Sequence, residues 1–318
     1  MCQPWLVTDG SRKAILAAFF ANLGISIAKF IGFLVTSSAG LLAEAGHSLA
    51  DTGNQGLLLL GGRRARRKAD VEHPFGYGRE RYFWAFVVAL VLFSMGGLFA
   101  LYEGISKVRH PHETENLIVA IGILVFAIAL ETYSLRTAVK EANHHKPKTM
   151  GWWKYIRTAK QPELPVVLLE DIGAEVGLFL ALGGVVTAEV TGNPRWDAVG
   201  SISIGVLLVV IAILLAVETK GLLIGEAAGT VERAAIVDAI RGADHVKRLI
   251  HVRTQHLGPD EILVAAKVEF DADLTFAELA AAINRGETRI RDAVPMARLI
   301  YLEPDVHTDV HTEQPPDE

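Results

Sequence analysis

Four polar side chains interrupt one of the long apolar stretches of this chain. Glu44, His47, Asp51 and Asn54 lie in "LLAEAGHSLADTGNQGLLLLGG", at intervals of three, four and three residues. On a helix this spacing places all four on one face. A lone carboxylate in lipid costs on the order of several kcal/mol, so the face must point into a protein interior. An imidazole four residues from a carboxylate can bind one divalent cation; a hydrogen-bonded polar seam between helices is the alternative.

A second acidic group lies in the apolar stretch "VVLLEDIGAEVGLFLALGG". Asp171 and Glu175 are four residues apart and share a helix face, whereas Glu170 points about 100° away. The apolar run before them favours burial over capping at the membrane surface. Packed against the first stretch, this face would complete a site of one nitrogen and several oxygens. The predicted metal ligands are His47, Asp51, Asp171 and Glu175, with Glu44, Asn54 and Glu170 as further candidates.

The elements that must position these groups are membrane helices. The chain is 51% hydrophobic and 21% charged, and its mean hydropathy is +0.31. A helix needs about 20 apolar residues to cross the hydrocarbon core. Six segments qualify: residues 14–35, 41–62, 82–105, 117–135, 165–190 and 198–223. The first is expected to be a retained membrane helix, because it exceeds signal-peptide length.

Charge distribution predicts the orientation of the bundle. The loop "RRARRKADVEHPFGYGRER" is strongly basic, and residues 136–160 contain seven Lys or Arg, whereas the opposite loops contain few. Basic loops stay in the cytoplasm, which places both termini there. The net charge of −5 gives no indication of a nucleic-acid partner. The single cysteine, Cys2, excludes an internal disulfide framework and a multi-cysteine zinc site.

The composition changes near residue 226. The following segment alternates helical and strand-like patterns in the order αββαβ, typical of a small α+β, ferredoxin-like domain. The sequence therefore predicts an α-helical membrane protein with a transmembrane domain over residues 11–225. A cytoplasmic domain over residues 229–305 and a disordered tail over residues 306–318 complete the prediction.

Several motifs together resemble the cation diffusion facilitator family. They are the His-x-x-x-Asp of the second span, the cytoplasmic "HPFGYGRERYFW", the "DAVGSISIGVLL" of the sixth span and the αββαβ unit. "HSLADTGNQ" and "LLEDIGAEVG" are most similar to the ZnT-9-like subgroup. The resemblance implies a homodimer without a prosthetic group that exports a divalent metal, foremost Zn²⁺, in exchange for protons. It also implies a multi-pass protein of the bacterial inner membrane.

The family's transport site uses two residues each from spans two and five. His47 and Asp51 match the first pair. Alignment through "LFLAL" places Asp171 on the family's acid and Val167 where the family has a second histidine. Glu175, Glu44 or Asn54 would then replace that ligand. More oxygens and fewer nitrogens favour a harder ion, so a Mn²⁺, Fe²⁺ or Co²⁺ transporter is the alternative.

Two other function classes compete with transport. An intramembrane metalloenzyme would need an open ligand position and a general base, and no H-E-x-x-H motif occurs. A non-transporting scaffold or metal sensor is the third class. Asp70 and His73 are expected to tether a loop. His245, His251 and His256 are expected to be surface histidines, because Ala266 and Tyr301 occupy positions where family members have ligands.

Overall fold

The computed structural model describes residues 15–16, 19–20, 22–28, 30–31, 34, 39–110 and 117–307, apart from the side chains of residues 39–47 and 145. The chain divides into two compact units. One comprises Met1–Arg66 and Glu80–Lys220, and the other Arg67–Arg79 and Gly221–Glu318. The loop between the second and third predicted spans therefore belongs to the same unit as the C-terminal domain.

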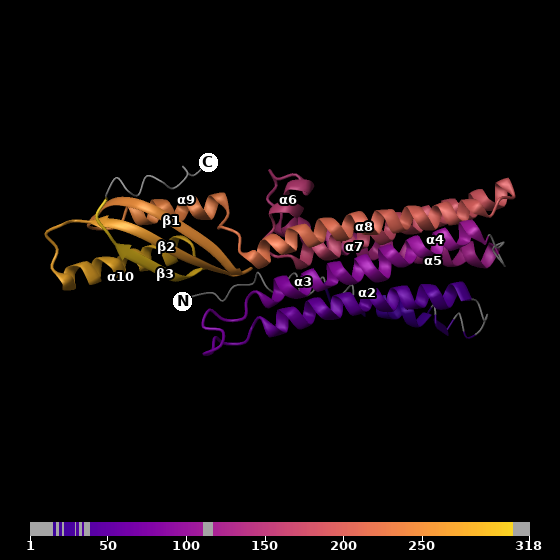
Figure 1. Ribbon diagram of the computed structural model, residues 1–318, viewed down its shortest axis with the longest axis horizontal. Coiled ribbons are helices and arrows are strands. Elements are labelled where there is room, and N and C mark those ends of the chain that lie inside the picture. The colour runs from indigo at the N-terminus through magenta and orange to yellow at the C-terminus, as the bar shows by residue number, and fades with distance from the viewer. Residues whose placement is uncertain are drawn as a thin grey trace. The chain divides into compact units, whose positions relative to one another are not determined.

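Long helices make up the first unit and run side by side (Figure 1). They are α2 (Ala39–Arg64), the continuous α3 (Glu80–Val91), η1 (Leu92–Leu98) and α4 (Phe99–Arg109), then α5 (Leu117–His145), α7 (Glu163–Thr191) and α8 (Arg195–Ile224). These helices coincide with the segments predicted as spans two to six. The described positions between residues 15 and 34 are also helical, and the rest of the first predicted span lies outside the described residues.

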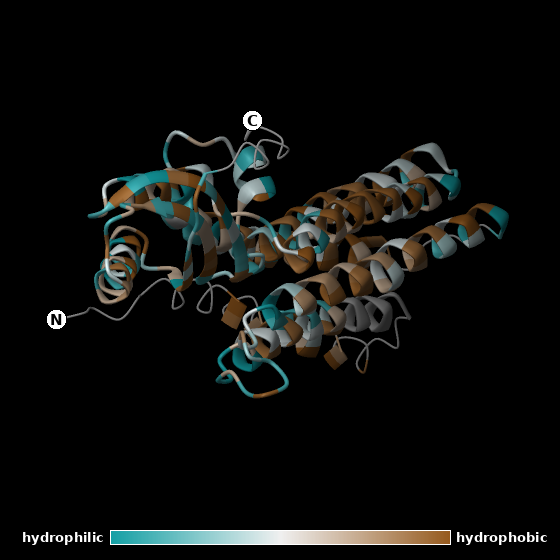
Figure 2. Cartoon of the chain, turned by 60° about the vertical axis from the view of Figure 1, so that its left-hand side comes forward, coloured by the Kyte–Doolittle hydropathy of each residue, from teal (hydrophilic) through white to brown (hydrophobic). Residues whose placement is uncertain are grey.

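Hydrophobic residues cover most of the long helices (Figure 2). Among the described residues, three helices are long and apolar enough to cross a membrane: Glu80–Arg109, Leu117–His144 and Arg195–Ile224. The two helices that carry the candidate ligands, α2 and α7, are not among these three. The count of six spans therefore remains a prediction.

The predicted end of the fourth span was wrong. Residues 136–160 were expected to form a loop, yet α5 continues to His145 and a short helix, α6 (Trp152–Thr158), follows. The reason lies in the buried face of α5. Its buried residues recur every three or four positions and pass beyond the apolar stretch: Leu124, Ala127, Glu131, Ser134, Ala138 and Ala142. Burial of this face extends the helix into polar sequence.

The helix formed by α3, η1 and α4 packs closely against α8 through glycines. A Cβ on Gly97 would lie 2.7 Å from Val209 Cγ2, and one on Gly104 would lie 2.6 Å from Ile202 Cγ1. Neither position can accept a side chain without a shift of its neighbour. Small residues of this kind let membrane helices approach closely. Gly96 and Gly97 lie within the π-helical segment η1, which the sequence pattern did not predict.

The second unit contains the predicted αββαβ order. It consists of α9 (Thr230–Arg241), β1 (Val246–Gly258), β2 (Glu261–Phe270), α10 (Phe276–Ala293) and β3 (Ala297–Pro304). The sheet order is β1-β2-β3, with β1 and β2 antiparallel and β2 and β3 parallel. Alternate residues of β2, such as Val264 and Val268, are buried with Ile236 of α9 and Ile290 of α10. These contacts form a core separate from that of the helical bundle.

The loop of residues 67–79 packs against the end of β1. A Cβ on Gly78 would lie 2.7 Å from the carbonyl oxygen of Leu257, and one on Gly258 would lie 2.9 Å from the Cα of Gly78. The two backbones therefore meet glycine against glycine.

Candidate metal centre

Glu170 faces α2 from α7. Its side chain is 5% exposed. Asn54 donates a hydrogen bond from Nδ2 to Glu170 Oε1 at 2.7 Å, and Gln55 donates from Nε2 to Oε2 at 3.4 Å. Asn22 in turn donates to Gln55 Oε1 at 3.4 Å. The buried side chain of Glu170 is therefore hydrogen-bonded by two amide groups, as buried polar groups require.

Asp171 and Glu175 face α5 instead. Ser134 donates from Oγ to Asp171 Oδ2 at 3.0 Å, and Thr132 donates from Oγ1 to Glu175 Oε1 at 2.7 Å. Asp171 is 1% exposed. The expected shared face of Asp171 and Glu175, and the separate direction of Glu170, are both present. The face meets α5, however, which the sequence did not identify as part of the site.

Asp51 connects the two sides of this centre. Its carboxylate lies close enough to Glu170 and to Asp171 to interact electrostatically with both. It is half-buried on α2, one turn before Asn54. Groups from α2 and α7 thus meet around Asp51, a pairing that the spacing of their polar residues left open.

Glu131 of α5 is a residue that the sequence interpretation missed. It is 9% exposed and occupies the middle of the buried face of α5, one turn before Ser134. Its charge acts on Glu170. An acid inside the apolar segment of residues 117–135 was the available signal, since an intramembrane ionisable residue is by default a functional candidate.

Two buried oxygens of this centre accept no hydrogen bond from the part of the chain that the structure describes. They are Asn54 Oδ1 and Glu175 Oε2. A buried acceptor without a donor is costly, and a bound cation or proton would satisfy it. The described residues contain no group of three or more His, Cys, Asp or Glu that could hold a metal ion as placed. Amide and hydroxyl donors hold the carboxylates of α7 toward different neighbours.

The set of donor atoms at this centre also depends on Glu44 and His47 of α2 and on the residue at position 167. The helix runs through Glu44 and His47, but their side chains lie outside the described part. On α7, Val167 is 1% exposed and belongs to the apolar core of the bundle. The described donors around the centre are therefore carboxylate, amide and hydroxyl oxygens, a set that suits divalent cations of harder character unless an imidazole joins it.

The loop of residues 67–79 shows the expected tether. Tyr77 donates from its hydroxyl to Asp70 Oδ2 at 2.6 Å, and the backbone N–H of His73 donates to Asp70 Oδ1 at 2.8 Å. These two bonds, the tyrosine hydroxyl first, hold the pKa of Asp70 below its ordinary value of 3.8. Asp70 therefore organises the loop in its ionised form.

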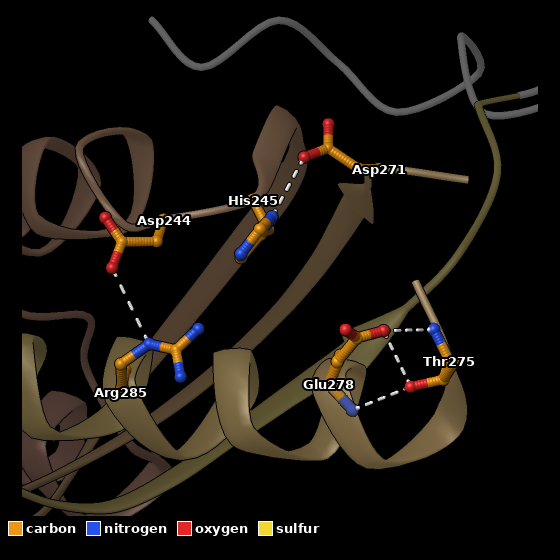
Figure 3. Close-up of polar contacts among 6 residues, drawn as sticks. All are labelled: Asp244, His245, Asp271, Thr275, Glu278 and Arg285. Carbon is orange, nitrogen blue, oxygen red and sulfur yellow. Dashed lines mark hydrogen bonds and ion pairs between the residues drawn. The ribbon is translucent and has the colours of Figure 1, made fainter. Parts of the chain in front are cut away.

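Two histidines of the second unit, His245 and His256, have structural partners. His245 Nδ1 lies 3.1 Å from Asp271 Oδ2, beside the capping box in which Thr275 and Glu278 bond reciprocally (Figure 3). His256 is 2% exposed, so the prediction of a surface histidine was wrong for this residue. Its Nδ1 lies 3.2 Å from the carbonyl oxygen of Gly258. The end of β1 is covered, which the alternation of a single strand cannot indicate.

Comparison with known proteins identifies the family. Residues 15–224 match the model of the cation efflux transmembrane domain. The human "Proton-coupled zinc antiporter SLC30A9, mitochondrial" is 30% identical over 263 residues, covering 82% of this chain and 46% of the human protein. "Metal tolerance protein C4" of Arabidopsis thaliana is 28% identical over 278 residues, covering 87% of this chain and 61% of that protein.

A bacterial relative matches over nearly its whole length. "Magnetosome protein MamB" of Magnetospira sp. (strain QH-2) is 26% identical over 292 residues, covering 88% of this chain and 92% of that protein. The chain spans about half the length of the human relative that it matches. The matched domain, the apolar helices and the buried polar groups of α2 and α7 agree: the chain is an integral membrane protein of the cation efflux, or cation diffusion facilitator, family and is similar to its ZnT-9-like members.

Proposed function

We propose that this chain is a secondary active transporter that exports a divalent metal cation, foremost Zn²⁺, from the cytoplasm in exchange for protons. The observation that carries the proposal is the acidic centre shared by α2, α5 and α7. Asp51 interacts electrostatically with Glu170 and Asp171, and all three lie on helices that the membrane domain contains. Acids inside membrane helices mark ion pathways.

The proposed transport site comprises His47, Asp51, Asp171 and Glu175, with Glu44, Asn54, Glu131 and Glu170 around it. Metal binding requires deprotonated ligands, so an arriving cation displaces protons from them. Buried carboxylates cannot all remain charged without a cation, so protons replace the metal when it leaves. Exchange of one for the other at a shared centre links metal export to proton entry. The exchange requires the bundle to open alternately to the two sides.

Exchange of a metal ion for protons breaks no covalent bond of a substrate, so the proposed transporter needs no catalytic group. Family members are transporters, and membership supports the prediction that the chain is not an enzyme. The human relative is named a proton-coupled zinc antiporter, which supports Zn²⁺ as the first ion to test. The oxygen-rich donor set and Val167 favour Mn²⁺, Fe²⁺ or Co²⁺ as the second choice. A homodimer in a bacterial inner membrane, with both termini in the cytoplasm, completes the proposal.

The test is metal flux into proteoliposomes that carry a pH gradient. Asp51→Asn and Asp171→Asn each remove one proposed ligand while preserving size. We expect each to lower Zn²⁺ flux by at least about tenfold, because loss even of groups that only support ligands costs ~10–100-fold in metal affinity. Asp238→Asn, an exposed acid of α9, is the matched control and should transport normally.

Near wild-type flux in either correctly folded variant would remove that residue from the site. Binding of Zn²⁺ without any flux by the wild-type protein would instead favour the scaffold or sensor. A panel of Zn²⁺, Mn²⁺, Fe²⁺, Co²⁺ and Cd²⁺ would decide the ion.

A further inference from the structure

The short helix α6 presents two different faces. It lies in the connection between α5 and α7 and begins after Gly151. Tyr155 and Ile156 are buried, whereas Trp152 and Trp153 are 38% and 59% exposed. Burial raises the pKa of Tyr155 to about 12, with the nearby Glu141 as a second cause. One face of α6 therefore fixes the helix to the bundle, and the other exposes two large aromatic rings.

An ion pair fixes the position of α6 along the axis of α8. Arg157 donates from Nε to Glu218 Oε1 at 3.1 Å. Residues 198–217 of α8 contain no charged residue, and Glu218 is the first after them. Glu218 thus marks the polar end of the apolar part of α8, where hydrocarbon gives way to headgroups. Figure 1 shows α6 beside this part of α8. Trp152 and Trp153 belong to α6, so they lie near this boundary between hydrocarbon and headgroups.

The surroundings of α6 are cationic. Residues 136–160 contain seven Lys or Arg and one acid, Glu141. Lys148 and Lys154 are exposed. Lys146 places Nζ 5.2 Å from the centre of the Trp152 ring. Exposed tryptophans at a polar boundary, with lysines beside them, are the combination that amphipathic segments use at the surface of acidic membranes.

From this combination we propose that α6 is a binding site for anionic phospholipid. The rings of Trp152 and Trp153 lie among the headgroups and upper acyl chains, and Lys148 and Lys154 bind headgroup phosphate. A second copy of the chain fits this face less well, because a twofold contact would bring two sets of like charges together. The inference depends on membrane embedding and not on the proposed transport activity.

Quenching by brominated lipids tests the site in the full-length protein. The protein is reconstituted in phosphatidylcholine vesicles with increasing phosphatidylglycerol, and one lipid or the other carries brominated acyl chains. Trp152→Phe/Trp153→Phe supplies the blank, so the difference in fluorescence reports α6 alone. We expect this signal to be quenched more strongly by phosphatidylglycerol than by phosphatidylcholine.

Lys148→Gln/Lys154→Gln should reduce the relative association constant for phosphatidylglycerol by about fivefold per lysine, since a basic residue at an acidic surface contributes ~1 kcal/mol. Arg241→Gln/Arg253→Gln removes the same charge from exposed positions of the second unit and should leave the constant unchanged. An α6 signal that neither lipid quenches would overturn the proposal. Equal quenching by both lipids, insensitive to the lysine substitutions, would overturn it as well. Neither readout requires metal transport, so failure here leaves the transport proposal standing.

Discussion

Glu131 is an acidic side chain at a buried position of an apolar helix. It lies between Ala127 and Ser134 on the buried face of α5. Glu131 interacts electrostatically with Glu170, as do Asp51 and Asp171. Several carboxylates in a low-dielectric interior repel one another and lose their hydration. A centre of this kind is stable only with cations or protons bound, which is the property that an exchanger needs.

The first prediction at this scale concerns Glu131→Gln, which removes the charge and preserves the size of the side chain. If Glu131 belongs to the transport centre, metal flux should fall by at least about tenfold and its dependence on the pH gradient should change. The measurement is flux in proteoliposomes at several external pH values. Glu189→Gln, an exposed acid near the end of α7, should behave as wild type.

A Glu131→Gln protein with unchanged flux and unchanged pH dependence would assign Glu131 to helix packing alone. Glu131→Asp distinguishes loss of chemistry from loss of fit, because it restores the charge on a shorter chain.

The second prediction at this scale concerns His47. A neutral imidazole favours Zn²⁺, whereas carboxylate favours harder ions. His47→Asp should therefore weaken Zn²⁺ transport and improve Mn²⁺ or Cd²⁺ transport relative to it. The pH profile should also change, because imidazole in water titrates near ~6.5 and carboxylate titrates lower. Relative rates for several ions, from about pH 6 to about pH 8, supply the readout.

The two roles of His47 separate clearly in that experiment. A packing residue would reduce all ions equally through misfolding. An unchanged order of ions together with an unchanged pH profile would show that His47 is not a ligand.

At the scale of elements, a buried ion pair joins the beginnings of α3 and α7. Arg81 donates from Nη2 to Glu163 Oε2 at 3.0 Å, and its Nε bonds Oε1. The side chains are only 10% and 4% exposed. The bidentate pair ties the helix that carries Asp171 to the helix that follows the basic loop.

Removal of one partner from this pair should be strongly destabilising, because it leaves a buried charge without compensation. We expect Arg81→Met to cost about 3–5 kcal/mol of unfolding free energy, and Arg81→Met/Glu163→Met to cost much less. Chemical unfolding in mild detergent measures both. Lys247→Met breaks the more exposed pair of Lys247 with Glu269 and should destabilise the protein far less than Arg81→Met. Equal losses for the single and double variants would contradict the argument.

At the scale of the whole molecule, the chain passes between its two units three times, through two segments. One connection is the end of α8, and the other is the loop of residues 67–79, which leads from α2 into the second unit and back into α3. Gly78 of this loop lies against Gly258 of β1. The helix that carries His47 and Asp51 is therefore covalently linked to a segment that packs on the C-terminal sheet.

The prediction at this scale is that the second unit does not itself bind zinc tightly. Ala266 is buried at one family ligand position, Tyr301 occupies another, and His256 is buried against the Gly258 carbonyl. A fragment of residues 229–305 has its own apolar core and is suitable for calorimetry. We expect weak binding at most. Submicromolar binding of one or more Zn²⁺ per chain would contradict this expectation and reopen a sensing role.

The sequence by itself determined the family, the long apolar helices and the order of the αββαβ unit. Apolar segments predicted the helices because burial in lipid requires continuous hydrophobicity, and period-two and period-3.6 patterns predicted the αββαβ unit. The spacing of His47, Asp51, Asp171 and Glu175 identified the candidate ligands because residues four apart on a helix share a face.

Tertiary structure decided which faces meet. Glu170 bonds Asn54 and Gln55 of α2, whereas Asp171 bonds Ser134 of α5. Glu131 joins the centre, and α5 extends to His145, because the packing of α5 buries that face. Sequence periodicity states only that a side chain lies on a face. The neighbour of that face is set by long-range packing between helices, which no local pattern contains.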